Sequence, residues 1–222
     1  MRPSLDGTGR AGRFANLLPA ARVWSLMGLL LATAGSAIGG AVTGIATRGC
    51  VDDVPWTRVA SGIWAWAPSA PAEIGPENGG HVAVTTAIVH GRQALLIDPG
   101  PSRAHGDRVR RSLVCRFGAT VRWIVNTHAH AENVLGNAAF ADRRAARRPP
   151  ILASAGTREA MARRCLVCLA SLSGRLGPEA MQGTRIVLPT RTLAEGDVLR
   201  LGPHRLRVLR IEQGHTEADL VL

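Results

Sequence analysis

The sequence predicts a mixed α/β (α+β) fold, and three observations lead to this prediction. Short runs of β-branched and aromatic residues are bounded by residues that favour turns. Two of these runs are separated only by residues 90–92, as expected for a hairpin. Between other runs lie longer segments whose apolar residues recur every three or four positions, as in amphipathic helices. Strands that form hairpins and also alternate with helices indicate a mixed sheet covered by helices.

The first half of the chain contains the predicted hairpin and one long helix. Ile63–Trp66 is an apolar and aromatic run followed by a loop rich in Pro and Gly, which predicts a strand. His81–Val89 and Gln93–Asp98 are the two strands of the hairpin. Ser102–Phe117 has apolar residues at fourfold spacing and predicts a helix. Val121–Val125 predicts the next strand.

The second half contains two helices and several short strands. A short helix is predicted near Val134–Arg144, and a strand at Ile151–Ala153. Thr157–Leu172 predicts a helix that Thr157 caps. Its predicted buried residues are Met161, Cys165, Cys168, Leu169 and Leu172. Further strand-like pieces occur at Arg185–Leu188, Val198–Leu201 and Arg205–Ile211.

A histidine motif follows the strand Val121–Val125 directly. In that strand we expect Val121, Trp123 and Val125 on one face and Ile124 on the other, so that the run 126–133 leaves the end of the strand. His128 and His130 are one residue apart and can both point at one cation, and neutral imidazole is a favoured zinc ligand. The candidate third ligand is His215, which also lies just beyond a predicted strand. Three imidazoles and one water form a catalytic zinc shell.

The order of these motifs resembles the metallo-β-lactamase superfamily. A strand, then His-x-His-x-acid, then Gly-His-Thr much later in the chain, is the layout of that superfamily, and Leu96–Gly100, Gly136-Asn137 and Thr216–Asp219 resemble it too. The resemblance spans about Ile63 to Leu222. It implies an αββα sandwich made of two similar halves.

Three phrases are most similar to one branch of that superfamily, the quinoprotein relay system zinc metallohydrolases. This branch is periplasmic and is linked with pyrroloquinoline quinone dehydrogenases. The phrases are Thr127–Phe140, Gly183–Thr190 and Gln213–Leu222. The resemblance therefore implies a small-molecule substrate and a possible quinoprotein dehydrogenase system as partner.

The motif departs from the usual pattern of the superfamily at one place. Where Asp-His is usual and helps to bind a second zinc, this chain has Glu132-Asn133. Asn is a weak neutral ligand compared with imidazole, so we expect one zinc ion. Glu132 would accept a proton from the metal-bound water or orient it, although it could also be a solvated loop acid.

The function predicted from these residues is zinc-dependent hydrolysis. A zinc-bound hydroxide would attack an ester, lactone, lactam or related bond, and Asn133 or Asn137 would hydrogen-bond the developing charge. Asp98 could cap a turn or, as the resemblance implies, brace the metal site through hydrogen bonds. Asp219 is expected to hold backbone rather than metal. The alternative is a non-catalytic metal-binding accessory protein of a periplasmic quinoprotein dehydrogenase system.

The end of the sequence lies inside a predicted strand. Seven residues follow His215, and the last four, Asp219–Leu222, are strand-like with no turn or polar tail after them. We therefore expect the domain, residues 63–222, to be truncated, with the carboxy-terminal half of the sandwich missing. The sequence would then be a fragment.

The amino terminus predicts export. Residues 1–22 form a basic n-region, and residues 23–47 carry no charge and form either a signal peptide or a membrane anchor. Because the positive flank stays inside, the domain is expected in the periplasm or anchored to the outer face of the cytoplasmic membrane. Residues 48–62 are predicted to be a linker.

The charge of the chain is large but scattered. The formal net charge is +11, and all 27 basic residues are Arg. The only dense cluster is Arg143, Arg144, Arg147 and Arg148. Because the basic residues are not interleaved with aromatic residues, nucleic acid is excluded as a partner.

The remaining cysteines and histidines are predicted to have no catalytic role. Cys165 and Cys168 share the apolar face of a helix and are interpreted as core residues, with a local disulfide or a metal site as the alternatives. Cys50 and Cys115 have no evident partner. Four histidines are interpreted as turn or surface residues: His81, His90, His105 and His204.

Overall fold

The structure is a computed structural model that describes residue 50 and residues 54–69, 73–141 and 148–222. The predicted leader, residues 1–47, lies outside the described residues, as do Arg143, Arg144 and Arg147 of the arginine cluster. In the part of the chain that is described, no helix combines the length and the apolar character that a bilayer span requires.

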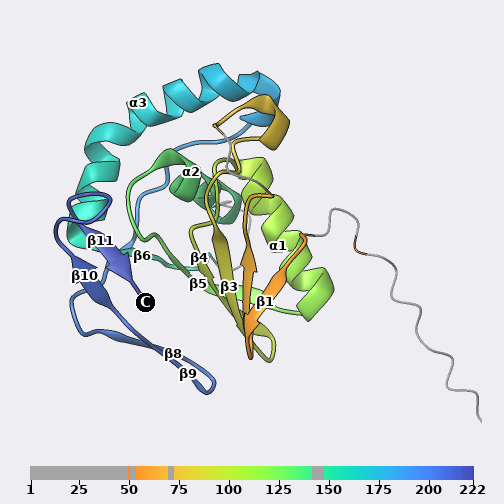
Figure 1. The fold of residues 1–222 in the computed structure, drawn as a ribbon, viewed down its shortest axis with the longest axis vertical. Helices are drawn as coiled ribbons and strands as arrows, with labels where there is room; N and C mark the ends of the chain where they lie inside the picture. Colours follow the sequence, from red (N-terminus) through yellow and green to blue (C-terminus); the bar gives the residue numbers. More distant parts are fainter. Residues whose placement is uncertain (1–49, 51–53, 70–72, 142–147) are drawn as a thin grey trace, which may run out of the picture. The chain divides into compact units, whose positions relative to one another are not determined.

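A seven-stranded mixed sheet forms the centre of the fold (Figure 1). Its strands lie in sequence order, and neighbours are antiparallel from β1 to β4 and parallel from β4 to β7. They are β1 (Thr57–Ala60), β2 (Ile63–Trp66), β3 (Thr85–His90), β4 (Gln93–Ile97), β5 (Thr120–Val125), β6 (Ile151–Ala153) and β7 (Arg191–Thr192). Two antiparallel pairs follow: β8 (Val198–Leu201) with β9 (His204–Arg207), and β10 (Leu209–Ile211) with β11 (Asp219–Val221).

Three α-helices and two 3₁₀ helices accompany the strands in the described residues. They are η1 (Pro76–Asn78), α1 (Arg103–Phe117), α2 (Ala131–Val134), η2 (Leu135–Phe140) and α3 (Ala155–Ala180). Ser102 caps α1 by accepting a hydrogen bond from the His105 backbone, which confirms the predicted helix. Helix α3 begins earlier than predicted, because the hydroxyl of Ser154 accepts from the backbone of Thr157. The cap is therefore Ser154, and the prediction that Thr157 caps this helix is wrong.

Two apolar cores lie on the two faces of the large sheet. On one face, Val109 and Leu113 of α1 and Phe140 of η2 pack against Leu96 and Ile124 of the strands. On the other face, Leu201 and Leu220 of the two strand pairs and Val208 between them pack against the sheet. The described residues thus form a helical layer, a large sheet and a smaller second β layer, which confirms the predicted mixed α/β fold.

A β-bulge changes the faces of β5. Ala94 pairs with Val121 but Leu95 pairs with Trp123, so Arg122 is an extra residue in β5. Val121 consequently packs with Ile124 on the side of α1, whereas Trp123 and Val125 pack on the other side. The prediction that Val121, Trp123 and Val125 share one face is therefore wrong for Val121.

Several other predicted boundaries differ from the structure. The helix predicted to start at Val134 starts at Ala131, directly after the histidine motif. Residues 185–188 form no strand, because Ile186 and Leu188 pack against Met161 and Cys165 without pairing. The strand predicted at Arg205–Ile211 is interrupted at Val208, and β1 was not predicted.

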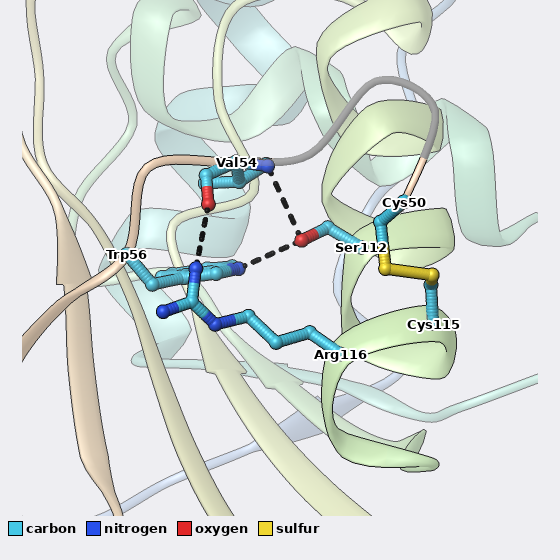
Figure 2. The surroundings of a disulfide bond; sticks show 6 residues. All are labelled: Cys50, Val54, Trp56, Ser112, Cys115 and Arg116. Carbon is cyan, nitrogen blue, oxygen red and sulfur yellow. Dashed lines mark hydrogen bonds between the residues drawn. A yellow bond between two sulfur atoms is a disulfide. The ribbon is translucent and has the colours of Figure 1, made fainter. Parts of the chain in front are cut away.

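The segment predicted as a linker belongs to the domain. Figure 2 shows Cys50 joined to Cys115 of α1 by a disulfide, with a Cα–Cα distance of 5.9 Å. The Val54 amide and the Trp56 ring nitrogen both donate to Ser112 Oγ, at 3.3 and 3.0 Å. Val54 and Trp56 are buried in the core against α1. The linker prediction for residues 48–62 is therefore wrong from Val54 onward, and Cys50 and Cys115 are partners of each other.

His105 is not a turn or surface residue, contrary to the prediction. It lies in the first turn of α1, is 8% exposed, and stacks on Trp66 with ring centroids 4.3 Å apart. The His81 ring contacts both of these rings, at 4.2 and 4.9 Å. Burial, together with the nearby His81 and Arg108, lowers the pKa of His105 to about 3. His105 is therefore neutral in the folded protein over the whole neutral range.

Removing the disulfide should destabilise the domain. The bond closes a loop with a sequence separation of 65 residues, and a disulfide of this kind stabilises by about 2–4 kcal/mol. The variant Cys50→Ala/Cys115→Ala should show that loss of unfolding free energy in urea titration monitored by circular dichroism. Wild-type protein with this bond reduced should show the same loss. Equal stability of oxidised wild type and the double variant would contradict this assignment.

The stability of the fold should fall in acid partly because of His105. Below pH 6.5 an unfolded His105 takes up a proton, whereas the folded one stays neutral until about pH 3, so protonation stabilises the unfolded state in this window. His105→Phe keeps a ring against Trp66 but does not titrate. The quantity to compare is the unfolding free energy of the variant minus that of the wild type. This difference should be larger below pH 6.5 than at pH 8, and it should grow as the pH falls towards 3. A pH-independent difference would refute this origin of acid sensitivity.

Candidate metal centre

Three histidines from two distant parts of the chain lie together. His128 and His130 are in the short connection between β5 and α2, and His215 is in the turn between β10 and β11. One ring nitrogen from each of them lies within 4.8 Å of the others. His128 and His130 are half-buried and His215 is exposed, so the cluster opens to solvent. The structure thus brings together the three predicted metal ligands.

The donor set of this cluster suits a divalent metal ion such as zinc. His130 Nδ1 lies 2.9 Å from His215 Nε2, and the three rings are mutually edge-on, with centroids 4.5–5.1 Å apart. Burial, followed by the neighbouring rings of His130 and His215, lowers the pKa of His128. A lowered pKa keeps this imidazole neutral near pH 7, which is the form that binds zinc.

Thr127 and Asp98 fix the orientation of His128. Thr127 donates its hydroxyl to Asp98 Oδ2 at 2.5 Å and its backbone N–H to Asp98 Oδ1 at 2.9 Å. The same hydroxyl lies 2.8 Å from His128 Nδ1, which then donates to it. This arrangement leaves Nε2 of His128 for a metal, as partners of histidine ligands usually do. Of the two predicted roles of Asp98, the geometry supports the brace.

Asp98 occupies a costly position in the fold. It is 5% exposed, and its φ of 52° places a non-glycine residue in the left-handed region. Burial raises its pKa to about 6, although hydrogen bonds from Thr127 and Asn133 act in the opposite direction. A residue in such a backbone conformation persists only where the surrounding contacts hold it there.

Asp219 holds the turn that carries His215. Its carboxylate accepts hydrogen bonds from the backbone of His215 and Thr216 and from the Thr216 hydroxyl. Burial raises the pKa of Asp219, but these hydrogen bonds outweigh it and the pKa is lowered. A Cβ at Gly214 would lie 2.5 Å from Asp219 Oδ2, so this close approach requires glycine.

The His215 turn is also fastened to the rest of the site. The backbone N–H of Leu220 donates to the carbonyl of Thr127, the residue before His128. The hydroxyls of Ser154 and Thr157, at the start of α3, both donate to the Ala218 carbonyl. These bonds set the position of His215 relative to His128 and His130.

The remaining predicted site residues have distinct surroundings. Glu132 lies on α2 rather than in a loop, and its Oε1 is 3.6 Å from His130 Nδ1. Asn133 is buried and donates to Asp98 Oδ2 at 3.2 Å. Asn137 is fully buried; its amide pairs with Asn126 and also donates to the Val187 carbonyl. These bonds occupy both N–H groups of the Asn137 amide, and its predicted contact with a developing charge stays a prediction.

Three cavities meet at His130. One of about 350 Å³ lies between the start of α3 and the His215 turn, and Arg164 and Thr216 line it. A second of about 430 Å³ is lined by His215 as well. A third of about 360 Å³ is more apolar and is lined by Val167 and Leu172 of α3 together with Glu132. Solvent therefore reaches His130 alongside α3.

Sequence reasoning missed Thr127 and the α3 residues around the cavities. Thr127 stands beside His128 in the motif, but only the structure shows its hydroxyl between the ring and Asp98. Arg164 and Val167 belong to the predicted helix Thr157–Leu172 but are not among its predicted buried residues. No local signal in the sequence identifies them.

Loss of the Thr127 hydroxyl should weaken metal binding. Thr127→Val keeps the shape and the backbone N–H but breaks the link between Asp98 and His128, and such partners are worth about 10–100-fold in metal affinity. Competition with a chromophoric chelator should show a zinc affinity lower by that factor. The matched control is Thr192→Val on an exposed position of β7, which should bind as wild type. Equal affinity of both variants would refute the role of Thr127.

Comparison with known proteins identifies this fold. A family model described as the metallo-beta-lactamase superfamily matches residues 78–157, and no curated protein matches the chain. The mono-zinc form of the metallo-beta-lactamase FIM-1 from Pseudomonas aeruginosa matches with a TM-score of 0.54 at 19% identity, over 77% of this chain and 65% of that chain. A metallo-beta-lactamase from Hirschia baltica has a TM-score of 0.54 at 16% identity, over 76% and 65%. One from Pontibacter korlensis has 0.51 at 19%, over 75% and 64%.

The chain spans about 65% of the length of these solved structures. At such identities the likeness concerns the fold, and the match to the family model includes His128 and His130. The similarity to the quinoprotein relay branch stays a prediction. The fold is metallo-β-lactamase-like, and within it residues 78–157 match the model of the metallo-beta-lactamase superfamily.

Proposed function

We propose that this protein is a zinc-dependent hydrolase that cleaves an ester, lactone, lactam or related bond. The observation that carries the proposal is the convergence of His128, His130 and His215 at a solvent-accessible point where three cavities meet. The fold similarity to metallo-beta-lactamases supports it.

The three histidines would hold the ion. A zinc ion with three imidazole ligands lowers the pKa of a bound water to about 7 and stabilises negative charge on an oxygen. Thr127 and Asp98 keep His128 in the tautomer that presents Nε2 to the ion. Asp219 keeps His215 in place through its backbone.

Glu132 is the residue that we propose moves a proton. Its carboxylate lies beside His130 and lines the apolar cavity, so it faces the space that a substrate would enter. A carboxylate there would accept a proton from an attacking water at Oε and return it to the leaving group. Arg164, which lines two of the cavities, would attract a substrate carrying negative charge.

We propose one zinc ion per chain. The residue that would serve a second ion, Asn133, is buried and donates to Asp98 instead. Its amide is a weak ligand in any case.

We also propose that the protein works in an oxidising compartment outside the cytoplasm. The disulfide between Cys50 and Cys115 supports this, because such bonds persist in secreted and periplasmic proteins and are rare in the cytosol. The basic n-region predicted from the sequence agrees with export.

Zinc content and turnover test the function together. The purified full chain, loaded with zinc and dialysed, should hold one zinc per chain and hydrolyse at least one member of a panel of chromogenic esters, lactones and lactams. His130→Ala should lose both the zinc and the turnover. His90→Ala, a matched change at an exposed histidine of β3, should lose neither. A zinc-loaded protein with no turnover on the whole panel would argue against a hydrolase.

Glu132→Gln separates the proton role from metal binding. The variant keeps the size of the side chain, so zinc content should stay at the wild-type level. Because general acid–base groups contribute about 10²–10⁴-fold, kcat should fall by that factor. A variant with unchanged kcat would show that Glu132 is only a neighbour of the site.

A further inference from the structure

Two thiols on α3 lie next to the candidate metal centre but are not part of it. Cys165 and Cys168 are three residues apart on this helix, so their side chains lie on neighbouring positions of its surface. Cys165 is fully buried, whereas Cys168 is half-buried. They are the free cysteines of the chain, since Cys50 and Cys115 are already paired.

These thiols pack against the residues on either side of His130. Cys165 belongs to a small apolar cluster with Val134 and Met161, against which Ala129 packs. Cys168 packs against a second cluster, which contains Ala131 and Leu172. Ala129 and Ala131 flank His130 in the chain. The position of His130 therefore depends on the packing around both thiols.

Cys168 is accessible from the metal centre. It lines the cavity of about 350 Å³ and the cavity of about 360 Å³, and His130 lines both of them too. A reagent that enters either cavity would meet the Cys168 thiol close to His130. Cys165 lies behind it in the core, and burial together with Cys168 raises the pKa of Cys165 to about 11.

We propose that Cys165 and Cys168 are a dithiol modification site that small-molecule disulfides oxidise to an intramolecular disulfide, and that its closure displaces the segment carrying His130. The Cys168 thiolate attacks the small-molecule disulfide, forms a mixed disulfide and releases one thiol. The Cys165 thiol then loses its proton and attacks Cys168 Sγ, which releases the second thiol. Two cysteine sulfurs are oxidised, and the small disulfide is reduced to two thiols.

Closure cannot leave the packing unchanged. Residues three apart on a helix have Cβ atoms about 5–6 Å apart. A disulfide requires about 3.5–4.5 Å between these atoms. The turn 165–168 must therefore contract, and this withdraws atoms from the contacts with Ala129 and Ala131. The consequence for metal affinity rests on the proposed function, whereas the closure and the displacement do not.

Peptide mapping tests the closure. Trypsin releases both cysteines on one peptide, Cys165–Arg175, because Arg164 and Arg175 precede and end it. After incubation of the folded full chain with oxidised glutathione, this peptide should be lighter by two hydrogen atoms and resist alkylation, and dithiothreitol should restore two alkylatable thiols. Recovery of only unmodified or singly glutathionylated peptide would overturn the proposal.

Hydrogen exchange tests the displacement. In Cys50→Ala/Cys115→Ala, where these are the remaining cysteines, backbone amides of residues 129–134 should exchange several-fold faster in the oxidised form than in the reduced form. Cys168→Ala in this background lacks the thiol that lines the cavities and cannot close the bond, so it should exchange at one rate under both conditions. Equal exchange in the two forms of the parent would overturn the coupling.

Zinc affinity then distinguishes this inference from the proposed function. Oxidation should lower the zinc affinity of the parent by several-fold and leave that of Cys168→Ala unchanged. Reduced protein that binds no zinc would refute the proposed function, while the exchange measurement still decides the inference on its own.

Discussion

The candidate site depends on one buried carboxylate that ties the ends of two strands together. Asp98 follows β4, and its oxygens accept from Thr127 after β5 and from Asn133 of α2. The Asp98 turn approaches the start of η2 so closely that a Cβ at Gly136 would lie 2.2 Å from the Pro99 carbonyl oxygen. Burying an acid and placing its backbone in the left-handed region are both costly. The hydrogen bonds that offset this cost are the ones that orient His128.

The other half of the site is positioned from the second β layer. His215 lies beside His128 and His130 because hydrogen bonds hold its turn on both sides. Leu220 donates to Thr127, and the hydroxyls of Ser154 and Thr157 donate to Ala218. Asp98 and Asp219 thus have parallel tasks at the two loops: each accepts backbone and hydroxyl donors and fixes a histidine indirectly. Rigid backbone on both sides suits a metal centre, because imidazole ligands must be held within narrow distances.

The sequence alone could predict those parts of the site that depend on residues close together in the chain. His128 and His130 are one residue apart at the end of an apolar strand, and His215 lies in a glycine-flanked turn, so their chemistry could be inferred without coordinates. The extra residue in β5 could not be inferred, because a bulge depends on the pairing with β4. The bond between Cys50 and Cys115 was missed because pairing across 65 residues leaves no local pattern. The burial of His105 was missed because it depends on contact with Trp66, far away in the sequence.

The link between Cys50 and α1 also determines how the domain bears mechanical load. β1 lies at the edge of the sheet, where it pairs with β2 among the described strands. Tension applied through the residues before Cys50 would peel such an edge strand away one hydrogen bond at a time. With the covalent bond in place, the pull passes to Cys115 and spreads over α1, whose buried side chains pack on the sheet. Tension from the amino-terminal side would then be borne by α1 as well as by the edge strand, and reduction of that bond would remove this covalent path.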